Sequence, residues 1–209
     1  RDWAAVYKGG GSVLLSDEAL IQDLQRFKDE GYQTTKFKIG GSGADFSQDI
    51  RRLEKARRAL GDDFGIAVDA NQAWDAKTAF AFAKEAAPFG VAWLEEPVHA
   101  YDMDALRELR DLLDNAGIVM EIAMGESVRS YHTHVAYAQH GVDHLQPARL
   151  CCIAENMRVR EYARQHGCRI STGGFTFQNA ALGALYSEDE LLEYHQPLNE
   201  VLVPYFSLV

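Results

Sequence analysis

The sequence predicts a TIM-type (β/α)8 barrel, a closed ring of eight parallel strands alternating with helices, and three observations favour this fold. Short apolar stretches alternate with helix-like stretches along the whole chain, and no strand–strand hairpin interrupts them. The apolar stretches lack polar alternation, which is typical of strands covered on both faces. Lys38, Asp69, Glu95 and Glu126 each close such a stretch, at intervals of 31, 26 and 31 residues, close to the roughly 30 residues of a βαβ unit.

The elements follow from β-prone clusters and from the stretches between them. The strands are expected at residues 3–8, 33–39, 64–70, 91–95, 118–124, 142–145, 168–171 and 191–194. The helices are expected at about residues 17–30, 45–60, 75–88, 102–113, 130–139, 153–166 and 178–186. Residues 9–12, with the sequence Gly9-Gly10-Gly11-Ser12, are interpreted as a loose turn after the first strand.

Capping residues and apolar spacing support the helices. Asp17 is expected to cap the first helix and Gly31 to end it. Asp75 or Lys77 opens the third helix, and Pro88 ends it. Apolar residues spaced for one buried face mark three of the helices: Leu20, Leu24 and Phe27; Ile50, Leu53 and Leu60; Leu106, Leu109 and Leu113. A doubly wound open sheet is the alternative, but no stretch resembles its glycine-rich phosphate loop.

Composition describes an ordinary globular domain. The 209 residues are 47% hydrophobic and 25% charged, and no linker divides them. The net charge of −10 argues against a nucleic-acid partner. No apolar run reaches the roughly 18 residues of a membrane span, and no signal peptide is apparent. Three cysteines without a Cys-x-x-Cys pair predict neither a disulfide framework nor a zinc site, so a cytoplasmic protein is expected.

Charged residues at the strand ends are the candidate functional groups. Alternate residues of a strand share a face, so Lys36 and Lys38 point the same way, whereas Glu95 and Glu96 point oppositely. Two lysines inside a barrel require balancing anions. The alternative is a rim position with both ammonium groups in solvent.

Three acids lie at successive strand ends: Asp69, Glu95 and Glu126. Each alone is compatible with an exposed surface position. Together they favour a shared site, because the carboxyl ends of barrel strands meet at one face. Their mutual repulsion calls for a divalent cation, and an all-oxygen ligand set indicates a hard ion such as Mg²⁺.

Four linked motifs resemble the enolase superfamily and, within it, the mandelate racemase / muconate lactonizing enzyme branch. The motifs are Lys36-x-Lys38, Val68-Asp69-Ala70-Asn71, Trp93-Leu94-Glu95-Glu96-Pro97 and Gly125-Glu126. The resemblance covers nearly the whole chain in this order and spacing. It implies that Lys38 removes the proton α to the carboxylate of a small substrate and that Lys36 neutralises the carboxylate and the enolate. It also implies one Mg²⁺ ion held by Asp69, Glu95 and Glu126.

The resemblance assigns two further residues to the substrate. Asn71 would lie beside the metal, and Glu193 matches a late family glutamate that hydrogen-bonds the substrate carboxylate. A solvated acid at the strand end is the alternative for Glu193. Family members also carry an N-terminal capping domain and assemble into homo-oligomers. We therefore expect residues 1–209 to be a single barrel domain, truncated at both ends relative to the family and without the capping domain.

Two departures from the family pattern concern the reaction. The racemase-like group has an Asp after strand six and a His after strand seven, where this chain has Ala148 and Gly173. Loss of this pair disfavours two-base racemisation, since inversion needs an acid and a base on opposite faces. A single lysine suffices for a syn elimination of a β-hydroxyl. Lys36 is expected to lower the pKa of Lys38, which would keep part of Lys38 neutral.

The expected function is therefore an Mg²⁺-dependent lyase of the acid-sugar dehydratase type. The alternatives are a racemase, epimerase or cycloisomerase of the same superfamily, and a non-catalytic relative that lost the dyad. The clustered histidines, His132, His134, His140 and His144, are interpreted as structural. His195 and Tyr7 lie near strand ends, where contact with the substrate is an open possibility.

Overall fold

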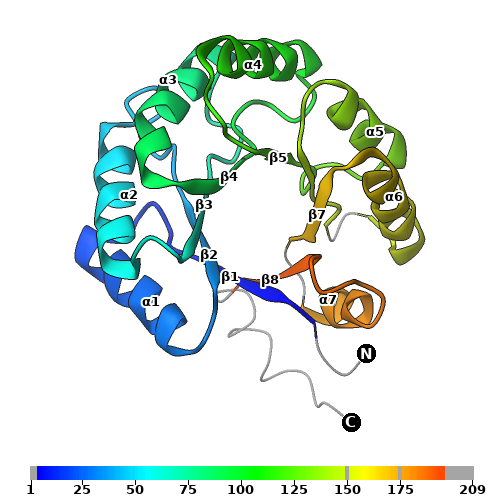
Figure 1. The fold of residues 1–209 in the computed structure, drawn as a ribbon, viewed down its shortest axis with the longest axis horizontal. Coiled ribbons are helices and arrows are strands. Elements are labelled where there is room, and N and C mark those ends of the chain that lie inside the picture. The colour runs from blue at the N-terminus through cyan, green and yellow to red at the C-terminus, as the bar shows by residue number, and fades with distance from the viewer. Residues whose placement is uncertain (1–3, 149–150, 174–175, 196–209) are drawn as a thin grey trace.

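The protein folds as a closed barrel of eight parallel strands in the order in which they occur in the sequence, as the computed structural model shows (Figure 1). The structure describes residues 4–148, 151–173 and 176–195. Pairing of β1 with β8, from Val6 opposite Leu192 to Gly9 opposite His195, closes the ring. The strands are β1 Val6–Gly10, β2 Thr34–Lys38, β3 Gly65–Asp69, β4 Val91–Glu95, β5 Ile122–Met124, β6 His144–Leu145, β7 Arg169–Thr172 and β8 Leu191–His195. The predicted fold class is confirmed.

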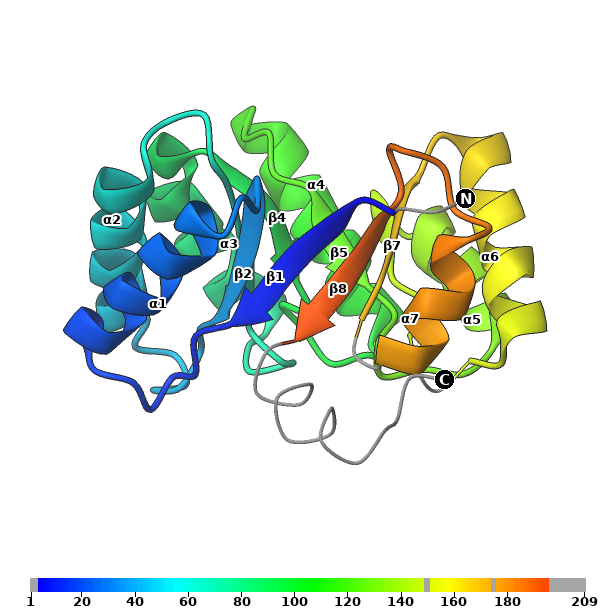
Figure 2. The same ribbon diagram turned by 90° about the horizontal axis from the view of Figure 1, so that it is seen from below.

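Helices form an outer ring around the strands, and the strands run in one direction (Figure 2). The helices are α1 Asp17–Asp29, α2 Ser47–Leu60, α3 Ala76–Ala86, α4 Met103–Ala116, α5 Tyr131–Gln139, α6 Ile153–His166 and α7 Thr176–Gly183, with a 3-10 turn η1 at Ala87–Phe89. Among the described residues, none of the helices has the length and apolar character needed to cross a membrane.

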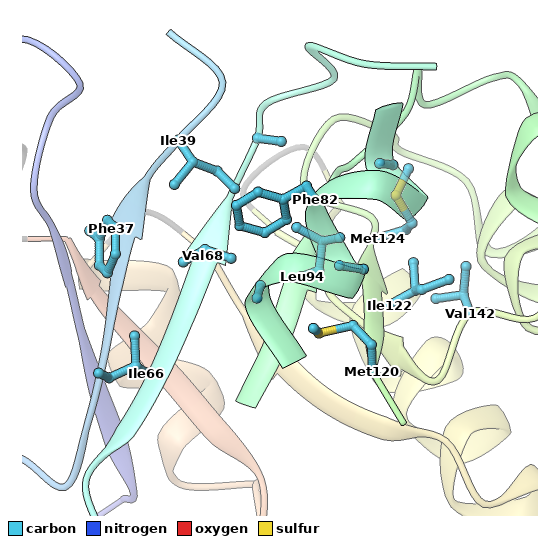
Figure 3. Close-up of a cluster of buried hydrophobic side chains, with 14 of the residues drawn as sticks. Phe37, Ile39, Ile66, Val68, Phe82, Leu94, Met120, Ile122, Met124 and Val142 are labelled. Carbon is cyan, nitrogen blue, oxygen red and sulfur yellow. The ribbon is translucent and has the colours of Figure 1, made fainter. Parts of the chain in front are cut away.

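The main core lies between the strands and the helices. Figure 3 shows part of it, where Phe82 of α3 lies near Val68 of β3 and Leu94 of β4, and where outward-facing side chains of β2 and β5 belong to the same cluster. Phe37, Val68 and Leu94 are fully buried in this layer, so each strand contributes the face opposite to its charged end residues. The barrel interior has a small apolar layer of its own, formed by Tyr7, Ala67, Trp93 and Ala123.

Several predicted boundaries need correction. Gly9 and Gly10 belong to β1 and are not in a turn, because their lack of a side chain admits neighbours that approach closely. Ser16, and not Asp17, caps α1, since its hydroxyl accepts the Ala19 N–H at 3.2 Å. Strand β5 starts only at Ile122. Helix α4 continues to Ala116, and α7 spans Thr176–Gly183. Asp75 caps α3 as expected, accepting from Thr78 N at 2.8 Å.

Candidate metal and substrate site

Three carboxylates from successive strand ends converge in the structure. One oxygen each from Asp69, Glu95 and Glu126 lies within 4.8 Å of the others. Asp69 and Glu95 are the last residues of β3 and β4, and Glu126 follows β5 after Gly125. Within the described residues, this is the one group of three or more possible metal-ligating side chains that gathers so tightly. The convergence expected from the sequence is therefore present.

The loops that follow or carry these acids have unusual backbone conformations. Asn71, Gln72 and Glu96 have φ values of 43°, 65° and 38°, a region that non-glycine residues rarely adopt and that clusters at functional sites. Gly125 has a φ of 139°, and a Cβ there would lie 2.7 Å from Nε2 of His134. A glycine is thus required directly before Glu126.

Lys36 occupies the centre of the barrel. Its side chain is 2% exposed and pairs with Glu95, with Glu193 at 3.1 Å and with Asp69 at 3.5 Å. Burial lowers the pKa of Lys36, but the carboxylates of Glu193 and Glu95 outweigh it and raise the pKa well above its usual value. Lys36 therefore stays protonated near neutral pH, and because its side chain is buried, the rim alternative for this residue is wrong.

Lys38 lies nearer to solvent. Its ammonium group pairs with Asp69, and 24% of its side chain is exposed. Burial and the charge of Lys36 both lower the pKa of Lys38, as expected, but Asp69, Glu126 and Glu95 together reverse this, so the net shift is upward. The predicted net lowering is wrong, because the attraction of the three neighbouring acids outweighs burial and the repulsion from Lys36.

The charges of the site fit a divalent cation. The carboxylates of Asp69, Glu95, Glu126 and Glu193 gather around two ammonium groups, which leaves two negative charges without compensation. Burial, and next to it repulsion from Glu95, raise the pKa of Asp69 despite the two nearby lysines. The three converging oxygens are hard ligands of the kind that Mg²⁺ prefers.

Glu193 lies inside the barrel and not in solvent. Its side chain is 2% exposed, so the solvated alternative is wrong. Two residues without a side chain make room for its carboxylate. A Cβ on Gly9 would lie 2.1 Å from Oε1, and a Cβ on Gly173 would lie 3.2 Å from Oε2.

Carboxylates lie beside the strand-seven position where the resemblance places a histidine. A Cβ on Gly173 would lie 3.3 Å from Oε2 of Glu126 and 3.6 Å from the Cβ of Ala148. A larger residue at position 173 would displace Glu126 or Glu193. Neither Ala148 nor Gly173 carries an acid, so the dyad positions cannot transfer a proton.

Asn71 links the metal ligands to an open cavity. Its Nδ2 donates to Oε1 of Glu126 at 3.3 Å, and its N–H donates to Oδ1 of Asp69 at 2.9 Å. A cavity of about 510 Å³ next to it is also lined by Lys38 and His195. Burial lowers the pKa of His195, so the ring is neutral near pH 7. Tyr7, by contrast, is fully buried and packs edge-on against Trp93 at 5.2 Å.

Sequence reasoning missed the residues that orient Glu95. Oε2 of Glu95 accepts from Trp93 Nε1 at 3.0 Å and from Gln146 Nε2 at 2.8 Å. Gln146 Nε2 also lies 3.2 Å from the Ser171 hydroxyl. The two-residue period of β4 places Trp93 on the same face as Glu95, a usable signal. Gln146 gave no such signal, because its partner is 51 residues away.

The histidines interpreted as structural include two fully buried residues, His134 and His144. His134 Nδ1 lies 2.9 Å from the Ser130 carbonyl oxygen. His144 packs edge-on against Trp93 at 5.0 Å, and burial together with the charges of Arg169 and Lys36 lowers the pKa of His144 to about 3. Both residues are uncharged near pH 7.

The barrel and its strand-end carboxylates define a (β/α)8 protein with its site at the carboxyl ends of the strands. The sequence profile of the family described as "Enolase C-terminal domain-like" matches residues 19–205. The chain belongs to this family, which confirms the resemblance to the enolase superfamily and its mandelate racemase / muconate lactonizing enzyme branch.

Known proteins resemble this chain in sequence and structure. It is 30% identical over 203 residues to the L-talarate/galactarate dehydratase of Salmonella typhimurium, covering 95% of this chain and 49% of that protein. It is 31% identical to the D-galactarolactone cycloisomerase of Agrobacterium fabrum, over 75% of this chain and 39% of that protein. The L-talarate dehydratase of Polaromonas sp. JS666, solved with Mg and L-glucarate, superimposes with a TM-score of 0.85 at 27% identity, covering 100% of this chain and 57% of that one. The chain thus spans about half the length of these relatives.

Proposed function

We propose that this chain is the barrel portion of an Mg²⁺-dependent enzyme that removes the proton α to a carboxylate and then expels a β-hydroxyl from an acid sugar. The single observation that carries the proposal is the convergence of Asp69, Glu95 and Glu126 within 4.8 Å, next to the partly exposed ammonium group of Lys38. The dehydratase names of two relatives and the Mg and L-glucarate bound to one of them support the same reaction class.

Asp69, Glu95 and Glu126 would hold the ion. When bound there, Mg²⁺ supplies positive charge that stabilises an enolate oxygen and offsets the carboxylates that raise the pKa of Lys38. Lys38 Nζ, at the mouth of the barrel, takes the α-proton and returns a proton to the departing β-hydroxyl on the same face. Loss of water leaves an enol that becomes a 2-keto-3-deoxy acid.

The remaining polar residues bind and orient the substrate. Lys36 holds a fixed positive charge beneath the site, which neutralises the carboxylate of the substrate and the developing enolate. Asn71 lines the open cavity next to Lys38 and would donate to a substrate oxygen. Glu193, paired with Lys36 at 3.1 Å, would hydrogen-bond the carboxylate of the substrate.

Cycloisomerisation is the second candidate, favoured by the 31% identity to the D-galactarolactone cycloisomerase. It begins with the same α-proton transfer, but the leaving group is a ring oxygen of the substrate itself, so a carbon–oxygen bond of the ring breaks and no water is lost. Two-base racemisation is disfavoured, because Ala148 and Gly173 provide no acid opposite Lys38.

The test is to incubate the chain with Mg²⁺ and a panel of acid sugars, including galactarate and L-glucarate, in D₂O. NMR is expected to show loss of the α-proton signal and formation of a keto acid. Lys38→Ala should lower the rate by about 10²- to 10⁴-fold, whereas Lys55→Ala, at an exposed ion pair with Asp17, should keep it. A folded, Mg²⁺-binding chain that exchanges no α-proton of any acid sugar would contradict the proposal.

A further inference from the structure

We propose that Glu96 is a positioning residue for the metal site. Together with Gln72 and Ser127 it forms a clamp, called here the Glu96 clamp, which fixes the strand ends that carry Asp69 and Glu126. The inference rests on the proposed magnesium site and adds to it three residues outside the ligand set.

Hydrogen bonds within the clamp satisfy a buried carboxylate. Oε2 of Glu96 accepts from Gln72 Nε2 at 3.1 Å and from the Ser127 hydroxyl at 3.0 Å, and Oε1 accepts from Ser127 N at 3.3 Å. Glu96 is 1% exposed. A carboxylate so buried is tolerated only where donors compensate for the lost water, so Gln72 and Ser127 are held where Glu96 needs them.

Each clamp residue follows one of the metal ligands in sequence. Glu96 comes directly after Glu95, Ser127 directly after Glu126, and Gln72 three residues after Asp69. The clamp therefore ties together the three loops that leave β3, β4 and β5. A shift of any one loop relative to the others would break at least one of its hydrogen bonds.

Backbone groups also form hydrogen bonds within the clamp. Gln72 N donates to the Glu96 carbonyl oxygen at 2.7 Å, and Gln72 Oε1 accepts from Ala100 N at 2.8 Å. Gln72 and Glu96 both have positive φ, at 65° and 38°. Such conformations persist only where the surroundings enforce them, and the hydrogen bonds of the clamp provide that enforcement. They keep Glu95 directed into the barrel, while the carboxylate of its neighbour Glu96 accepts hydrogen bonds from the two adjoining loops.

A carboxylate suits this position better than its neutral analogue. Glu96 accepts three hydrogen bonds through two oxygens. Glutamine has one acceptor oxygen, so at least one of the three donors would face an NH₂ group. Alanine would leave all three without their partner. The predicted order of Mg²⁺ affinity is wild type, then Glu96→Gln, then Glu96→Ala.

The test is isothermal titration calorimetry of the metal-free chain with MgCl₂, alongside thermal unfolding without metal. Glu96→Ala is expected to weaken Mg²⁺ binding by about 10-fold or more. Glu54→Ala removes the same charge from an exposed ion pair with Arg58 and should bind as the wild type does. Glu96→Gly removes the positive-φ strain, so it should unfold at a higher temperature than Glu96→Ala yet bind Mg²⁺ no better.

Further measurements separate positioning from general stability. Ser127→Ala should weaken Mg²⁺ binding. The double variant Ser127→Ala/Glu96→Ala should bind no more weakly than Glu96→Ala alone, because both substitutions break the same hydrogen-bonded clamp and their effects do not add. Wild-type affinity in folded Glu96→Ala and Glu96→Gly overturns the clamp and leaves the proposed function standing. A wild-type chain that binds no Mg²⁺ overturns both.

Discussion

Replacing Gly9 by alanine tests whether the space for Glu193 is built into β1. The added Cβ would lie 2.1 Å from Oε1 of Glu193, whereas ordinary contact begins at 3.4 Å. The carboxylate must therefore retreat by about 1.3 Å, which a hydrogen-bonded ion pair does not tolerate. Its 3.1 Å ion pair with Lys36 would break, so both the melting temperature and kcat/KM should decrease.

The expected sizes follow from overpacking and from a lost charged contact. Overpacking a core costs about 1–3 kcal/mol, which lowers the melting temperature of a chain of this size by about 2–12 °C. If Glu193 contacts the substrate, loss of one charge-assisted hydrogen bond costs about 1.5–3 kcal/mol. That corresponds to a drop in kcat/KM of about 10- to 150-fold.

Gly10→Ala is the matched control, since Gly10 lies next in β1 but faces outward. Its Cβ would lie 3.2 Å from the ring of Phe27, so a small shift of the ring suffices. Thermal unfolding and kcat/KM are measured for both variants and for Gly9→Ala in a Glu193→Ala background. In that background the Gly9 substitution should cost little. Equal losses for both glycine variants, or an undiminished loss without Glu193, would refute the reasoning.

Three further predictions concern pH, metal and stereochemistry. The pKa of His144 is about 3 in the folded state, below its unfolded value of about 6.5, so its contribution to stability is full above pH 6.5 and falls as the pH decreases. Between pH 7 and 5 the free energy of unfolding of the wild type should fall by about 2 kcal/mol through this group, measured by denaturant titration. His144→Phe should not show this loss. MgCl₂ at 100 times its Kd should stabilise the chain by about 2.7 kcal/mol, detected in a thermal-shift assay. Glu126→Gln should abolish this gain, because it removes a metal ligand. The same variant should melt at a higher temperature than the wild type without metal, because it removes one of the repelling carboxylates. Substrate recovered from D₂O by chromatography should carry deuterium at the α-carbon with its configuration unchanged, and recovery of the deuterated epimer would point to a second base.

The sequence predicted those features whose signal is local. Periodic apolar residues and the regular spacing of strand-end charges gave the barrel, because each βα unit folds on its own pattern. The same spacing placed Asp69, Glu95 and Glu126 at one end of one sheet, and topology then brought them together. Each acid of the trio could be predicted from its own strand-end position, without reference to a distant side chain.

Features that depend on distant partners were not predictable in this way. Gly9 and Gly10 have low strand propensity, which favours a turn, yet they belong to β1, where Gly9 makes room for Glu193 of β8. The upward pKa shift of Lys38 depends on Asp69 from the neighbouring strand. Such contacts join residues far apart in sequence, and only the closed ring defines them.

The arrangement around Gly173 connects the missing dyad to the chemistry. The resemblance places an acid opposite Lys38 at positions 148 and 173, and in this chain the carboxylates of Glu126 and Glu193 lie against Gly173. Glu193 is paired with the cation of Lys36, and Glu126 belongs to the ligand trio. In the proposed reaction, proton transfer would take place on the side of Lys38 and of the open cavity that it lines with Asn71. A reaction in which one base both takes and returns the proton is the reaction that such a one-sided site supports.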